Sequence, residues 1–141
     1  MPIQYYDPAI NYYVDDVERA VRFYSEHFGL IETFRTPEDG TLLHVEVRSG
    51  PLILGLAAKE AARAMHGLPV GEGGSPRAEV VIWTDDVDLA YQTLLAHGVP
   101  GLSAPHNFLG RLRAAWVIDP DENPVEIVAQ LFASSNGEQN Q

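Results

Sequence analysis

The sequence contains no cysteine among its 141 residues. Disulfides, thiolate-bound metal ions and cysteine nucleophiles are therefore excluded. Basic residues are also scarce, because 9 Lys and Arg stand against 20 Asp and Glu and leave a net charge of −11. A protein that binds nucleic acid or an anionic membrane needs a basic surface, so we expect neither of these partners.

Long hydrophobic segments are missing as well. No apolar run approaches the roughly 20 residues that a membrane-spanning helix requires. The first ten residues, MPIQYYDPAI, lack the basic and apolar regions of a signal peptide. Because 45% of the residues are hydrophobic, the chain can still bury a core that offsets the entropy of ordering. We expect one cytoplasmic domain.

Motifs of several enzyme classes are absent too. The sequence has no G-x-S-x-G nucleophile elbow and no H-E-x-x-H zinc site. The glycines of GEGG, residues 71–74, lack the preceding strand and following helix of a phosphate-binding loop.

The sequence does contain an internal repeat. Residues 15–17, Asp-Asp-Val, recur as residues 85–87, half the chain length later. The segment 28–30, Phe-Gly-Leu, is answered by 97–99, His-Gly-Val. The two halves therefore resemble two copies of one module.

Each copy has the pattern of a strand, a helix and three further strands. Apolar residues spaced by three and four predict helices that start near Val17 and Val87 and end at Gly29 and Gly98. Asp15 with Glu18, and Asp85 with Asp88, have the spacing of a helix capping box, so capping explains the acidic pairs 15–16 and 85–86. The expected strands are 9–14, 31–35, 41–48 and 51–57, then 79–84, a segment around Leu102, 112–118 and 124–130.

The remaining segments complete the expected organisation. A short helix is predicted at 59–66, and PHNFLGRL, with His106 and Arg111, is predicted to be a loop that covers a cavity or simply connects two strands. We expect a single domain over 1–132 and a disordered tail over 133–141. Within it, module one spans 8–66, the linker 67–76 and module two 77–132.

Alternation along the strands separates one face that packs under the helices from one that is turned away from them. The second face is mixed in character, with carboxylates, aromatic rings and small residues, which is more typical of a cavity lining than of a solvent face. The sequence does not assign Trp116 to either face. The residues expected to line the cavity and bind a ligand are Asn11, Tyr13, His44, Glu46, Glu79, Trp83 and Glu126.

The double pattern, with the segments VDDVERAVRFYSEHFGL and VIDPDENPVEIV, resembles the vicinal oxygen chelate superfamily. This group includes glyoxalase I, extradiol dioxygenases and bleomycin-resistance proteins, and the resemblance covers about residues 8–132. It implies an α+β fold of two tandem βαβββ modules that form a curved mixed sheet around a cavity. It also implies a homodimer.

Metal-binding members of that family take one ligand from the first and one from the fourth strand of each module. The matching positions here are Ala9, Gly55, Glu79 and Glu126. Alanine and glycine have no side-chain donor, and two carboxylates alone make at best a weak site. The resemblance therefore implies a protein without a metal cofactor. His44 and Glu46 could complete a non-standard metal site, or they could form an ordinary polar pair.

The sequence thus favours a metal-free protein that binds a small organic molecule, similar to the bleomycin-resistance branch. We expect planar aromatic or cationic ligands to stack on Trp83 beside Glu126. The alternative is a glyoxalase-like lyase or a dioxygenase-type enzyme with a non-standard metal site, or a metal-free catalyst with Glu126 or Glu79 as base. Both carboxylates have a simpler reading as solvated strand residues.

Overall fold

A computed structural model describes residues 4, 7–71 and 78–131. The chain divides into two compact units, Met1–Gly73 and Gly74–Gln141, which correspond to the two copies of the repeat. Residues 72–76 of the predicted linker and the predicted tail lie outside the described residues.

The first unit consists of one four-stranded sheet with two helices. The sheet has the strand order β1-β4-β3-β2, in which β1 is parallel to β4 and the other pairs are antiparallel. Its elements are β1 Ile10–Val14, α1 Val17–Phe28, β2 Ile31–Thr36, β3 His44–Ser49, β4 Leu52–Ala58 and α2 Lys59–His66.

The second unit repeats this topology with the strand order β5-β8-β7-β6. Here β5 is parallel to β8, and the other pairs are antiparallel. Its elements are β5 Val80–Trp83, α3 Val87–Ala96, β6 Gly101–Phe108, β7 Leu112–Ile118 and β8 Pro124–Gln130. The predicted α+β architecture of two βαβββ modules is confirmed.

The core of the first unit lies between α1 and one face of its sheet. The apolar stripe of α1 buries Ala20, Val21 and Tyr24, while alternate residues of β3 and β4 supply the opposing layer. These residues, Val45, Val47, Leu54 and Leu56, are all at most 1% exposed. The predicted packing of these four residues under the helix is therefore confirmed, whereas Ile10 and Leu52, predicted for the same face, are 54% and 38% exposed. α1 ends at Gly29, whose φ of 74° a residue with a side chain rarely adopts.

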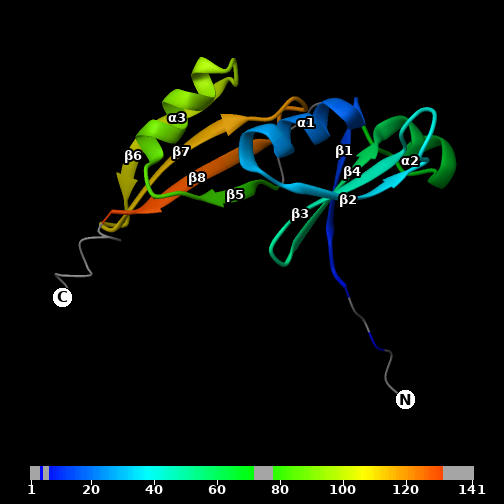
Figure 1. The fold of residues 1–141 in the computed structure, drawn as a ribbon, viewed down its shortest axis with the longest axis horizontal. Helices are drawn as coiled ribbons and strands as arrows, with labels where there is room; N and C mark the ends of the chain where they lie inside the picture. The colour runs from blue at the N-terminus through cyan, green and yellow to red at the C-terminus, as the bar shows by residue number, and fades with distance from the viewer. Residues whose placement is uncertain (1–3, 5–6, 72–77, 132–141) are drawn as a thin grey trace. The chain divides into compact units, whose positions relative to one another are not determined.

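In the second unit, α3 lies against one face of its sheet (Figure 1). Val87 and Tyr91 of α3 pack on Ala115 and Ala129, whose small side chains let the helix approach closely. Gly101 serves the same purpose on β6, because a Cβ there would overlap the hydroxyl of Tyr91. In both units the helix covers one sheet face and leaves the other to the candidate site residues.

The predicted helix caps are one residue too early. Asp16 caps α1 and accepts a hydrogen bond from the Arg19 amide at 3.0 Å, and Asp86 caps α3 in the same way through Leu89 at 3.1 Å. The first helical residues are Val17 and Val87. Asp16 and Asp86 directly precede them and have the extended backbone of a cap residue. Asp15 instead pairs with Lys59 at 3.1 Å.

The loop predicted for PHNFLGRL is also wrong over its first half. Residues up to Phe108 belong to β6, where His106 pairs with Ala114 and Phe108 with Leu112. Only the short connection that contains Leu109, Gly110 and Arg111 joins β6 to β7. Local sequence could not reveal this, because the pairing partner and the register shifts of β6 at Ser103 are tertiary features. The strand expected at 41–48 likewise begins only at His44.

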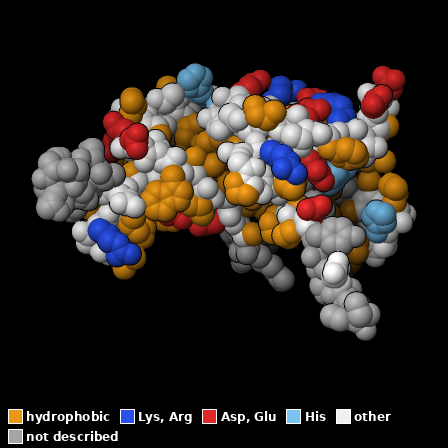
Figure 2. Space-filling model, turned by 60° about the horizontal axis from the view of Figure 1, so that its bottom comes forward, with side chains coloured by type: hydrophobic (Ala, Val, Ile, Leu, Met, Phe, Trp, Pro, Cys, Tyr) orange, Lys and Arg blue, Asp and Glu red, His pale blue; other side chains and the backbone are white. Residues whose placement is uncertain are grey.

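No helix in the described part of the chain is long and apolar enough to cross a membrane. Hydrophobic side chains nevertheless reach the surface beside charged groups, as the face drawn in Figure 2 shows.

We predict that Asp86→Ala lowers the free energy of unfolding by about 1 kcal/mol, because it removes the acceptor for the Leu89 amide at the start of α3. Asp85→Ala removes the neighbouring carboxylate but no cap, so its effect should stay within about 0.5 kcal/mol. Urea unfolding followed by circular dichroism measures both. Equal losses in the two variants would contradict the assignment of the cap.

Candidate functional site

Four of the predicted site residues share the face of the first sheet that is turned away from α1. Strand register places Asn11 opposite Gly55, and Gly55 opposite Glu46. The next row on this face is formed by Tyr13, Ala57 and His44.

Gly55 lies under the side chains of Asn11 and His44. A Cβ at this position would overlap Oδ1 of Asn11 and come within 2.9 Å of Cε1 of His44. Any larger residue at position 55 would therefore displace the Asn11 amide. In the family resemblance this position carries a metal ligand; here a neighbouring amide occupies its space.

His44 and Glu46 come together as a polar pair. Nε2 of His44 lies 3.6 Å from Oε2 of Glu46, and both side chains are partly shielded from solvent. The ring of Phe34 lies 6.2 Å from that of His44, centroid to centroid. This arrangement agrees with the reading of the two residues as a polar pair.

The second sheet brings Glu79 and Glu126 together on its helix-averted face. Trp116 of β7 lies opposite Glu126 of β8 in the strand register. Nε1 of Trp116 donates a hydrogen bond of 3.0 Å to Oε1 of Glu79. Glu79 in turn lies close enough to Glu126 to raise the pKa of that carboxyl, so one indole and two carboxyls form a connected polar group.

Partial burial and the neighbouring Glu79 raise the pKa of Glu126. Burial is the larger cause, followed by the hydrogen bond with Glu79 and the repulsion between the two charges. The carboxyl of Glu126 therefore takes up a proton more readily than an isolated glutamate does.

His106 extends this group with a second ring. Its imidazole stacks on the indole of Trp116, with centroids 5.9 Å apart and planes 18° from parallel. Nδ1 of His106 lies 2.8 Å from the carbonyl oxygen of Ala104. Because a carbonyl can only accept, Nδ1 carries a proton and Nε2 of the neutral ring is an acceptor.

Trp83 lies on the same face but further along β5. It is four residues from Glu79, about 13 Å along an extended strand, and it is 59% exposed. It borders a separate hollow with Thr84, Asp85 and Gln130. The structure thus joins Trp116, rather than Trp83, directly to the carboxyl pair.

Sequence reasoning missed Trp116 and His106. Ala114 and Ala115, on opposite faces of β7, are each 0% exposed, so alternation gives no facing for Trp116. His106 follows a register shift of β6, which breaks the count from neighbouring residues. The only sequence signal was two aromatic residues on adjacent predicted segments.

The residues at the four family positions do not fit the usual metal site. Ala9 and Gly55 offer no donor, Glu79 already accepts the indole hydrogen bond, and burial beside Glu79 raises the pKa of Glu126, which disfavours the carboxylate form that a metal ion needs. Within residues 4, 7–71 and 78–131, no three His, Asp or Glu side chains gather as a metal cluster. A metal-free protein stays a prediction.

The raised pKa of Glu126 makes stability depend on pH. Between the ordinary glutamate pKa and the raised one, the folded chain holds more protons than the unfolded chain. The contribution of Glu126 to the free energy of unfolding is therefore complete below this window and is lost as the pH rises through it.

We predict that Glu126→Gln removes this decline, so that the variant gains stability relative to the wild type as the pH rises from 4 to 7. The exposed Glu122 lies just before β8, in the connection from β7. Glu122→Gln should leave the decline of stability with pH in place. Urea unfolding of the three proteins across this pH range measures the difference. If the difference in free energy of unfolding between the wild type and Glu126→Gln does not change with pH, the carboxyl pair does not form.

Comparison with known proteins places this geometry in a family. The model of the Glyoxalase/Bleomycin resistance protein/Dioxygenase superfamily matches residues 8–127. A family enzyme of that name from Burkholderia phytofirmans PsJN is 22% identical, with a TM-score of 0.75 over 87% of this chain and 98% of that one.

Two further solved structures share the fold. TioX from Micromonospora sp. ML1 is 24% identical, with a TM-score of 0.67 over 87% of this chain and 98% of that chain. Lactoylglutathione lyase from Agrobacterium tumefaciens is 24% identical, with a TM-score of 0.65 over 86% and 92%. No protein with a curated functional description matches the sequence. The match over most of its length shows that the chain belongs to the Glyoxalase/Bleomycin resistance protein/Dioxygenase superfamily.

Proposed function

We propose that the protein binds a small cationic aromatic molecule on the helix-averted face of its second sheet, without a metal ion. The observation that carries the proposal is the connected group of His106, Trp116, Glu79 and Glu126, in which a stacked ring pair adjoins a carboxyl pair. Small-molecule sites usually combine apolar and aromatic side chains with a few convergent polar groups.

The ring pair supplies the surface for a planar ligand. The indole of Trp116 is held by its hydrogen bond to Glu79 and by stacking on His106, so little rotamer entropy is lost when a ligand stacks on it. A cation over an indole is worth on the order of 0.5–2 kcal/mol, more when water is excluded.

The carboxyl pair supplies selectivity for positive charge. Burial and Glu79 favour the protonated form of Glu126, and a bound cation favours release of that proton because it stabilises the Glu126 carboxylate. A neutral ligand gains nothing from this ionisation. Cation affinity should therefore rise as the pH increases through the raised pKa of Glu126.

The proposal follows the bleomycin-resistance branch of the family rather than its enzymes. Its support is the missing donors at Ala9 and Gly55, together with the Asn11 amide over Gly55. We keep the homodimer as part of the proposal, because α3 exposes Leu89 and Leu95 at 60% and 41%. Light scattering at the mass of one chain, 15.5 kDa, would contradict it.

A second candidate function is acid–base catalysis. A raised pKa makes Glu126 a stronger base than an ordinary glutamate, and Glu79 lies beside it. Mass spectrometry after long incubation separates the two: ligand recovered unchanged supports binding, whereas a product that Glu126→Gln no longer forms supports catalysis.

For the metal-free proposal we predict substoichiometric zinc, nickel, iron and manganese in protein purified without chelator. The physical reason is that two of the four family positions offer no donor. Elemental analysis by mass spectrometry is the measurement, with His44→Ala as the matched variant. A stoichiometric metal that His44→Ala loses would instead support a lyase or dioxygenase with His44 and Glu46 as ligands.

For ligand binding we predict that N-methylquinolinium quenches tryptophan fluorescence, and that Trp116→Phe weakens its binding about two- to thirtyfold through the lost cation–ring attraction. Trp83→Phe is the matched control, because Trp83 lies on the same face without contacting the carboxyl pair. Neutral 1-methylnaphthalene should bind more weakly and respond less to Glu126→Gln.

Two outcomes would contradict this site. If Trp83→Phe weakens binding and Trp116→Phe does not, the ligand stacks on Trp83, as the sequence alone predicts, and not on Trp116. If Glu126→Gln weakens the cation and the neutral probe equally, the carboxyl pair does not select for charge.

A further inference from the structure

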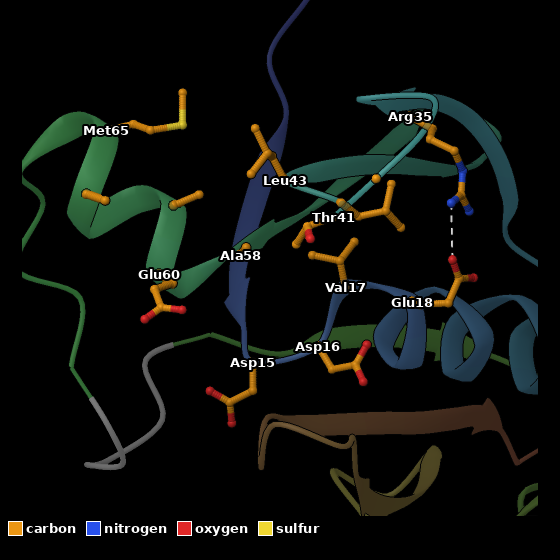
Figure 3. Close-up of a pocket in the computed structure, with 14 residues that line it drawn as sticks. Asp15, Asp16, Val17, Glu18, Arg35, Thr41, Leu43, Ala58, Glu60 and Met65 are labelled. Carbon is orange, nitrogen blue, oxygen red and sulfur yellow. Dashed lines mark hydrogen bonds and ion pairs between the residues drawn. The ribbon is translucent and has the colours of Figure 1, made fainter.

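The first unit contains a pocket on the opposite side of its sheet from Asn11, His44 and Glu46. Its volume is about 750 Å³, within the range of pockets that hold small molecules. Three segments surround it: the first turn of α1, the connection between β2 and β3, and one side of α2 (Figure 3).

The centre of this pocket is apolar. Val17, Leu43 and Ala58 lie in the middle of the view in Figure 3, and Ala61 and Ala64 of α2 continue the same surface. Met65 lines the pocket as well and is 60% exposed. A flexible thioether at an edge adapts to ligands of different shape.

The rim of the pocket is mainly acidic. Four carboxylates, those of Asp15, Asp16, Glu18 and Glu60, line it together with one guanidinium, that of Arg35. Arg35 is already engaged, with hydrogen bonds to Glu18 at 3.1 Å and to Glu32 at 2.6 and 2.8 Å. Even when Lys59, which pairs with Asp15, is counted, carboxylates outnumber the cations.

We propose that this pocket binds an organic cation whose apolar body lies on Val17, Leu43 and Ala61 and whose charged group lies near Glu60. The N-terminal turns of α1 and α2 alone would favour an anion, but their partial charges are smaller than the full charges of the rim. Among the described residues no His, Asp and Glu cluster could hold a metal ion, so the charge belongs on an organic group.

This site is independent of the function proposed above. Both tryptophans, Trp83 and Trp116, belong to the second unit, whereas the pocket is lined by residues of the first unit alone. Binding here is therefore read from backbone amides of the first unit, and either proposal can fail without the other.

The experiment is a titration of the ¹⁵N-labelled full chain with benzyltrimethylammonium, followed by NMR. We expect chemical-shift changes at the amides of Val17, Glu18 and Ala61, and weaker changes with neutral neopentylbenzene of the same shape. Glu60→Gln should weaken binding of the cation about two- to fivefold, the effect of one partly exposed charge.

Two matched controls make the test specific. Glu26→Gln removes an equal charge from the exposed side of α1, outside the pocket, and should not change the affinity. Ala64→Phe fills the pocket from an exposed helix position and should abolish the shifts at Val17, whereas His66→Phe adds a ring to the same helix outside the pocket and should not.

The proposal is overturned if no amide of the pocket responds, or if Ala64→Phe leaves the shifts at Val17 unchanged. It is also overturned if Glu26→Gln weakens binding as much as Glu60→Gln, because the cation would then respond only to the overall negative charge of the protein.

Discussion

The parallel pairing of the first and last strand in each unit decides which side chains share a sheet face. β1 runs beside β4 and β5 beside β8, in the registers Asn11–Gly55 and Val81–Glu126. A slip of one residue would turn every side chain of a strand to the opposite face. The carboxyl pair of Glu79 and Glu126, the Asn11 amide over Gly55 and both helix-facing cores all depend on these registers.

Helix packing then makes the two faces of each sheet different: one is buried under a helix and the other carries polar side chains. Burial of residues such as Tyr24 and Leu54, at 0% and 1% exposure, anchors α1 on one face, and the other face is free to carry polar groups at little cost to the core. Glu126 shows the consequence, since its partial burial beside Glu79 raises its pKa without unpairing it. Protonation removes the charge of a partly buried carboxyl and so reduces the cost of burying it.

The two units use the same topology for different chemistry. On the first sheet, a glycine leaves room for an amide and an imidazole, whereas on the second a stacked indole and imidazole adjoin two carboxyls. The helix side of the first unit adds an acidic pocket. A duplicated module thus presents several unlike surfaces, because its scaffold depends on the buried set of residues and leaves the others free to vary.

Much of this was determined by the sequence alone. The repeat, the succession of strands and helices along the chain and the facing of Val45, Val47, Leu54 and Leu56 follow from sequence patterns, which are local properties. Glu79 and Glu126 were placed on one face by counting from neighbouring turns and helix starts. Only the tertiary structure decided that Trp116 and His106 join them, because β7 carries buried alanines on both faces and β6 shifts register at Ser103. It also decided that the caps are Asp16 and Asp86, since two adjacent aspartates fit the sequence pattern and the backbone conformation selects between them.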